Sequence, residues 1–127
     1  MEEVIESMES ILTSIKKLLG IMSDYTNFDD DIIIHINTAF AMLNQLGVGP
    51  EGGFMIVDAN SRWEDYTTEK NLNMVKTYIY LKVRLLFDPP TSTALIESIN
   101  RTLSEIEWRI FLEGDPKPVE EPPSDKQ

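Results

Sequence analysis

The sequence contains no cysteine, and only 11 of its 127 residues are lysine or arginine. Without cysteine the chain has no disulfide, no zinc–thiolate site, no iron–sulfur cluster and no cysteine nucleophile. Its 22 Asp and Glu residues give a formal net charge of −11. This charge disfavours tight binding to nucleic-acid phosphates and a polybasic membrane anchor, because both depend on lysine and arginine.

Long hydrophobic runs and targeting signals are missing as well. The strongest apolar stretch, residues 32–46, is interrupted by polar residues such as His35 and Asn37 and is too short to span a bilayer. The N-terminus Met-Glu-Glu is acidic where a signal peptide is basic. The length suits one domain with a real core. We therefore expect a soluble, acidic single domain made in the cytosol.

Hydrophobic spacing predicts four amphipathic helices, because apolar residues recur in steps of three and four. Gly20 and Gly47 are the stop signals of the first two, and Asn27 is the expected N-cap of the second. Asp88-Pro89-Pro90 stops the third, since proline lacks an amide hydrogen. The first two predicted ranges are about 4–19 and 28–46. The third helix starts between residues 68 and 72 and runs to 87, and the fourth covers about 92–113.

Residues 54–57 (Phe-Met-Ile-Val) are typical of a short β-strand between the second and third helices. A strand needs a partner, which is either a hairpin return near Arg62 and Trp63 or a neighbouring chain. The expected fold is therefore mainly α: a four-helix bundle-like subunit with a short strand or hairpin and an extended tail. Residues 1–113 form the predicted helical domain, and residues 114–127 form a Pro-rich, acidic C-terminal tail.

No constellation of catalytic or metal-binding residues stands out. His35 follows Asp31 by four residues, the spacing of a base and its orienting carboxylate, but an exposed ion pair is the ordinary outcome. Asp29, Asp30 and Asp31 point about 100° apart on a helix and cannot converge on one cation. They suit the positive end of a helix dipole instead. We expect no enzyme, no cofactor and no metal site.

Several segments between residues 11 and 110 together resemble one protein family. The most specific are Phe87-Asp88-Pro89-Pro90 and Glu105-Ile106-Glu107-Trp108-Arg109. The others are residues 15–21, 28–29, 36–50, 54–56, 63–66, 75–79 and 83–86. On these segments the chain resembles the head–tail connector (adaptor) proteins of long-tailed bacteriophages, especially those of Gram-positive hosts.

The resemblance implies a mainly helical subunit that assembles into a ring of about a dozen copies, with a dodecamer expected. The ring sits beneath the portal protein and extends the DNA channel. On its other side a tail-side connector or stopper protein binds to it. DNA passes through without specific binding. The resemblance also implies a structural protein without enzymatic activity, cofactor or membrane association, located in the virion after assembly in the host bacterial cytoplasm.

Two sets of residues are candidates for contacts in such a ring. The third helix has a second apolar stripe and the strand lacks a partner, which suggests an interface between subunits formed by Phe54, Met55, Ile56, Val57, Trp63, Tyr66 and Tyr78. The prolyl tail suggests docking to the portal or an adjacent connector through Arg109, Pro116, Pro118 and Val119. For Trp63 and Tyr66, a place in the core is at least as common as an exposed anchor.

A small acidic helical inhibitor or a DNA mimic that binds a basic partner is the competing interpretation. The net charge suits it. A mimic, however, spaces its carboxylates along one exposed face like phosphates, whereas here they cluster at helix starts and in the tail.

Overall fold

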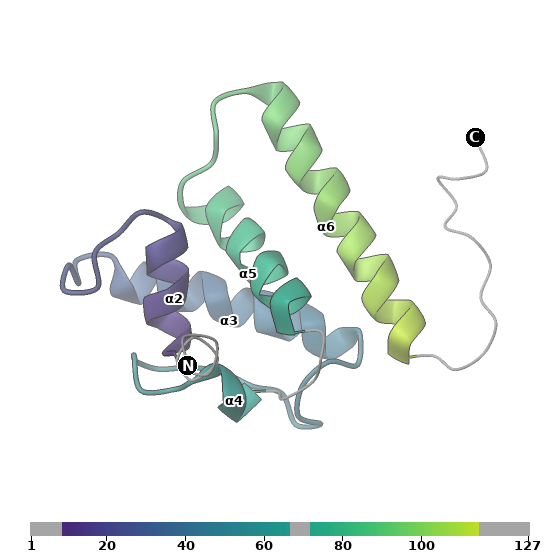
Figure 1. Cartoon of the computed structure of the whole chain (residues 1–127), viewed down its shortest axis with the longest axis horizontal. Coiled ribbons are helices and arrows are strands. Elements are labelled where there is room, and N and C mark those ends of the chain that lie inside the picture. The colour runs from purple at the N-terminus through teal and green to yellow at the C-terminus, as the bar shows by residue number, and fades with distance from the viewer. Residues whose placement is uncertain (1–8, 67–71, 115–127) are drawn as a thin grey trace.

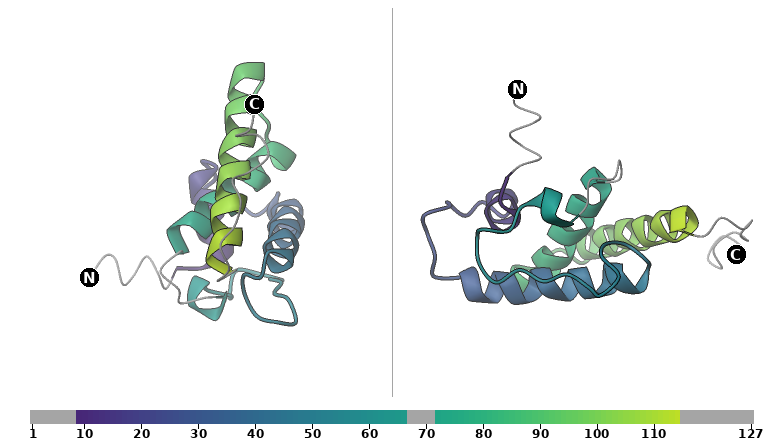
Figure 2. Two further views of the ribbon diagram at one scale, coloured as in Figure 1. Left: turned by 90° about the vertical axis from the view of Figure 1, so that its right-hand side faces the viewer. Right: turned by 90° about the horizontal axis from the view of Figure 1, so that it is seen from below.

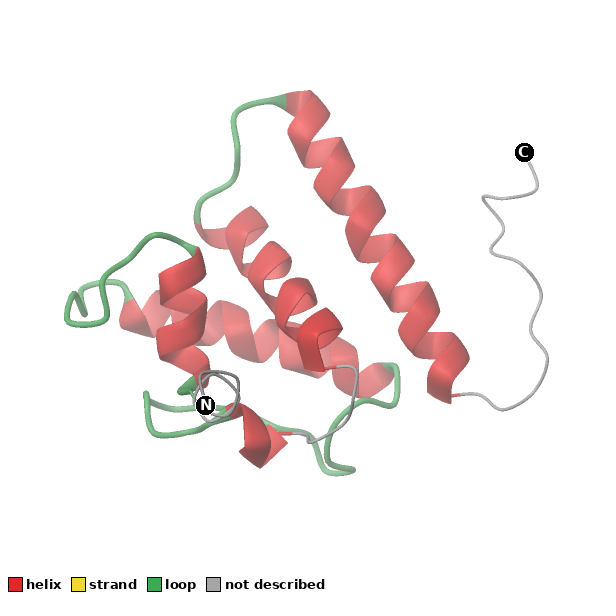
Figure 3. Ribbon diagram, viewed as in Figure 1, coloured by secondary structure: helices red, strands yellow, loops and turns green. Residues whose placement is uncertain are grey.

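The computed structural model describes residues 9–66 and 72–114, and within these ranges it consists of helices and loops (Figures 1 and 3). The prediction of a mainly helical fold is confirmed. The predicted strand or hairpin is wrong, because no strand forms in the described part of the chain. The helices are α2 (Ile11–Leu18), α3 (Asp29–Gln45), α4 (Trp63–Tyr66), α5 (Leu72–Phe87) and α6 (Thr93–Gly114).

The helices pack in two layers. α2, α5 and α6 lie side by side, and α3 crosses behind α2 and α5 (Figures 1 and 2). α5 is the central helix, since it packs against α2, α3 and α6. The buried stripes of these helices meet in one core, to which the short helix α4 adds the fully buried ring of Trp63.

The four predicted helices correspond to α2, α3, α5 and α6, and the ends differ for identifiable reasons. Ser10 caps α2, because its Oγ accepts a hydrogen bond from the Thr13 amide at 3.1 Å. The predicted start near residue 4 lies outside the described residues. Asn27 is not the cap of α3: Phe28 holds that position without a side-chain cap, and three aspartates in the first turn supply the favourable negative charge.

Residues 54–57 find their backbone partner in a side chain rather than in another strand. The Asn37 amide of α3 accepts a hydrogen bond from the Ile56 N–H at 2.8 Å and donates one to the Ile56 carbonyl at 2.9 Å. The expected hairpin return near Arg62 pairs elsewhere, in a single antiparallel bridge with Ser10. The Ile11 amide there donates to the Ser61 carbonyl at 2.9 Å. Both sets of bonds hold the long connection between α3 and α5 against the helices.

Candidate assembly surface

The segment 54–57 alternates between core and surface. Ile56 is buried, whereas Met55 and Val57 are 68% and 76% exposed. Phe54 is half-buried, and its ring lies 5.1 Å from Phe40 and 5.2 Å from Tyr66. Of the four residues predicted at this position, Met55 and Val57 are therefore the ones that remain largely exposed.

The three other aromatic residues expected at the interface lie in the core. Trp63 is fully buried, and its Nε1 donates a hydrogen bond to Ser14 Oγ at 2.7 Å. Tyr66 is 5% exposed, and Tyr78 is fully buried. The Tyr78 hydroxyl donates to Glu107 Oε2 of α6 at 2.8 Å. Burial, reinforced by this bond and by the Glu107 charge, raises the pKa of the Tyr78 phenol above its ordinary value.

The outer side of α3 carries exposed residues that the sequence pattern did not single out. We call Ile34, Thr38, Ala41, Met42 and Gln45 the α3 face; all are exposed, Ile34 by 60%. No Asp, Glu, Lys or Arg occurs from residue 32 to residue 50, so the face is uncharged beyond the aspartates of the first turn. The sequence does contain one sign of this face, because Ile34 is apolar but lies off the buried stripe of its helix.

A buried lysine organises the loop between α2 and α3. Lys16 is 2% exposed, and its Nζ lies 2.8 Å from Asp29 Oδ1. The same nitrogen donates to the carbonyls of Ser23 at 3.1 Å and Tyr25 at 2.7 Å. The sequence offered one sign of this role, because Lys16 stands four residues after Leu12 on the apolar side of its helix.

This loop leads into an aromatic cluster at the end where α3 begins and α5 ends. The rings of Tyr25 and Phe28 lie 5.7 Å apart, and those of Phe28 and Phe87 lie 5.3 Å apart, both in edge-to-face arrangements. Tyr25 and Phe28 are 45% and 41% exposed. The contact between Phe28 and Phe87 thus places the start of α3 against the end of α5.

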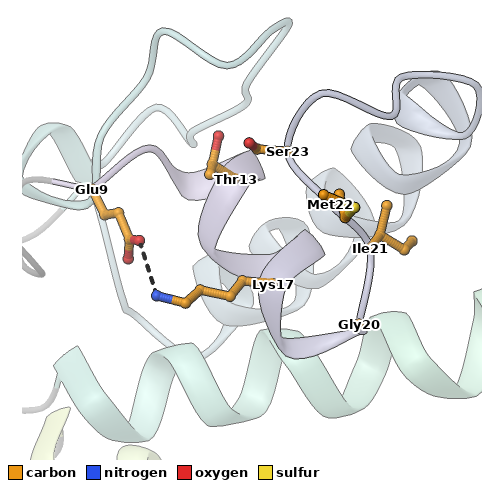
Figure 4. Close-up of a pocket in the computed structure, with 7 residues that line it drawn as sticks. All are labelled: Glu9, Thr13, Lys17, Gly20, Ile21, Met22 and Ser23. Carbon is orange, nitrogen blue, oxygen red and sulfur yellow. Dashed lines mark ion pairs between the residues drawn. The ribbon is translucent and has the colours of Figure 1, made fainter.

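A groove of about 430 Å³ runs beside α2 (Figure 4). Glu9 and Lys17 face one another across part of it at 3.8 Å, and Lys17 is 79% exposed. Its lining offers no convergent acid, base and nucleophile. Nor do the described residues hold a group of three or more His, Asp or Glu placed to bind a metal ion. Asp31 and His35 form no ion pair within the described chain.

Of the four predicted docking residues, only Arg109 lies in the part of the chain that the structure describes. Arg109 is exposed and pairs with Glu105, with Nε and Nη2 at 3.1 and 2.7 Å from the same carboxylate oxygen. Pro116, Pro118 and Val119 lie outside the described residues. Among the helices in the described ranges, none is long and apolar enough to cross a membrane.

Comparison with known proteins finds one matching family. The searches of curated proteins and of solved structures return no match. The family model described as "Phage connector protein" matches residues 11–117, which include every described helix. The match also covers the Phe-Asp-Pro-Pro turn and the Glu-x-Glu-Trp-Arg segment. The chain therefore belongs to the phage connector proteins, a family of structural proteins of the bacteriophage head–tail junction.

Proposed function

We propose that this connector forms a ring of about a dozen copies between the portal and the tail of the virion. In this position the ring extends the DNA channel during assembly and genome ejection. The family match over residues 11–117 carries the proposal. Exposed apolar side chains support it, because Ile34, Met55 and Val57 leave surface that a neighbour can cover.

The charge distribution fits a duct better than a DNA mimic. A chain with a net charge of −11 repels phosphate at short range, so DNA passes without being held. A mimic requires carboxylates at regular spacing along an exposed face. The long helix α3 carries none after Asp31.

We further propose that Arg109 and the tail 114–127 dock on the portal or on an adjacent connector. Arg109 is exposed in the last turns of α6, five residues before the tail begins at residue 114. The tail contains four prolines and one large apolar residue, Val119. This composition offers few apolar side chains for a core of its own and suits a segment that contacts a larger neighbour.

The test combines the full chain with the portal protein of the same phage. We expect a complex whose mass, by light scattering and native mass spectrometry, corresponds to a ring of connectors on the portal. Electron microscopy should show an added layer around a continuous channel. Portal that stays unbound at micromolar connector concentrations would refute the proposal. Deleting residues 115–127 should weaken this binding, and unchanged affinity would refute the proposed role of the tail.

A further inference from the structure

We propose that neighbouring copies in the ring meet front to back, with the α3 face of one copy against the outer side of α5 in the next. The inference rests on the proposed ring and names its interface. The relevant surface of α5 consists of Asn73, Thr77, Tyr80, Leu81 and Arg84, which we call the α5 face.

The α3 face is the surface on which self-association meets the least electrostatic resistance. Every copy carries a net charge of −11, so two copies repel wherever their carboxylates approach one another. The α3 face has no carboxylate after Asp31 and exposes Ile34 by 60%. Met42, at the edge of the face, is 39% exposed, and its sulfur lies 3.8 Å from the Tyr78 hydroxyl. Interface cores are depleted of charge and enriched in such apolar residues.

The α5 face carries one cation, Arg84, and no carboxylate. α5 contains no Asp or Glu but carries Lys76, Lys82 and Arg84. None of these cations forms an ion pair with a carboxylate in the described part of the chain. The side chains of Lys76 and Lys82 lie over the rings of Trp63 and Tyr78 within their own subunit.

Arg84 is the cation that points to an external partner. Its Nη1 reaches the Tyr80 hydroxyl at 3.4 Å, a long hydrogen bond. Its Nε is buried without an acceptor. Arg84 as a whole is only half-buried, so a carboxylate of a second copy can approach the guanidinium from outside and form a charge-assisted hydrogen bond with it.

The placement of the two faces allows this contact to repeat around a ring. α3 packs against α5 through the buried stripes of both helices, and each of the two faces lies on the opposite side of its helix from that stripe, so the two faces look away from one another. The contact of Phe28 with Phe87 places the start of α3 and the end of α5 at the same end of the molecule. Front-to-back stacking with a rotation of about 30° per copy, as a dozen copies require, therefore brings Asp30 and Asp31 of one copy toward Arg84 of the next.

Ring formation by charge-swapped variants tests the pairing. We expect Asp31→Lys alone and Arg84→Glu alone to raise the protein concentration needed for ring assembly by about tenfold or more. The chain that carries both substitutions should regain assembly, since each interface then holds a lysine and a glutamate. Glu51→Lys, in an exposed loop, is the matched control for Asp31→Lys, and Arg101→Glu on the exposed side of α6 is the control for Arg84→Glu.

The outcomes distinguish failure of this inference from failure of the proposed function. If the unmodified chain forms no ring with or without the portal, the ring and its interface both fail. If it forms rings and the single variants do so equally well, only the interface is refuted. Loss in the single variants without rescue in the double variant also refutes the pairing, provided that circular dichroism shows folded helices.

Ile34→Asp gives a second measurement that does not depend on Arg84. The side chain is 60% exposed, so the substitution leaves the subunit folded while it adds a charge to the α3 face. We expect ring assembly to fall by tenfold or more, whereas rings of undiminished stability would overturn the inference.

Discussion

Replacing Lys16 by methionine should destabilise the subunit far more than a surface lysine substitution. Lys16 Nζ binds the Asp29 carboxylate and two loop carbonyls from a position that is 2% exposed. Removing one partner of a buried ion pair costs about 3–5 kcal/mol. Asp29 remains 23% exposed and can gain water, and methionine retains most of the apolar stem. We therefore expect the free energy of unfolding to fall by about 2–4 kcal/mol.

Urea unfolding followed by far-ultraviolet circular dichroism measures this loss. Lys17→Met is the matched control, because Lys17 is the next residue and is 79% exposed. Its loose pair with Glu9, at 3.8 Å, should change the stability by no more than about 0.5 kcal/mol. If the two variants differ by less than about 1 kcal/mol, the loop does not depend on the buried ammonium group and the reasoning is wrong.

Three further predictions concern polar contacts in the core. Asn37→Ala removes both bonds to Ile56 and should lower the stability by about 1–3 kcal/mol; hydrogen exchange at the Ile56 amide should accelerate, and unchanged protection would contradict the role of the amide. Trp63→Phe removes the donor to Ser14 and should cost about 1–2 kcal/mol in thermal unfolding, whereas an unaltered melting temperature would show that the bond is dispensable. The pKa of Tyr78 is raised in the folded state, so its contribution to the free energy of unfolding is present below about pH 10 and is lost as the pH rises further, because the phenol of the unfolded chain ionises first. The free energy of unfolding above pH 10 should therefore fall more steeply in the unmodified chain than in Tyr78→Phe. Equal slopes for the two proteins would refute this.

The helices were predictable because their signals are local. In α6 the buried residues Ile99, Leu103, Ile106 and Ile110 recur in the spacing that the sequence displays. Local signals mislead for Phe54–Val57, because the β-branched and aromatic composition of this segment favours a strand and no strand forms there. Asn37, 19 residues earlier than Ile56, satisfies the backbone there instead. The composition of neither segment predicts this pairing.

The candidate surface was predictable only in part. Met55 and Val57 lie outside the core, whereas Ile56, Trp63, Tyr66 and Tyr78 fill the core; the interface itself stays a prediction. All seven interface candidates were chosen because they are apolar or aromatic. Apolar character serves a core and an interface equally well, so composition does not decide between them.

The sequence by itself determined the helical periodicity, the acidic charge and the family to which the chain belongs. Each of these depends on residue identity and on spacing within a few turns. The tertiary structure alone decided which apolar side chains remain exposed and how Lys16 and Asn37 are used. Those outcomes depend on which elements pack together, because burial and the pairing of polar groups are properties of neighbours in space and not of neighbours along the chain.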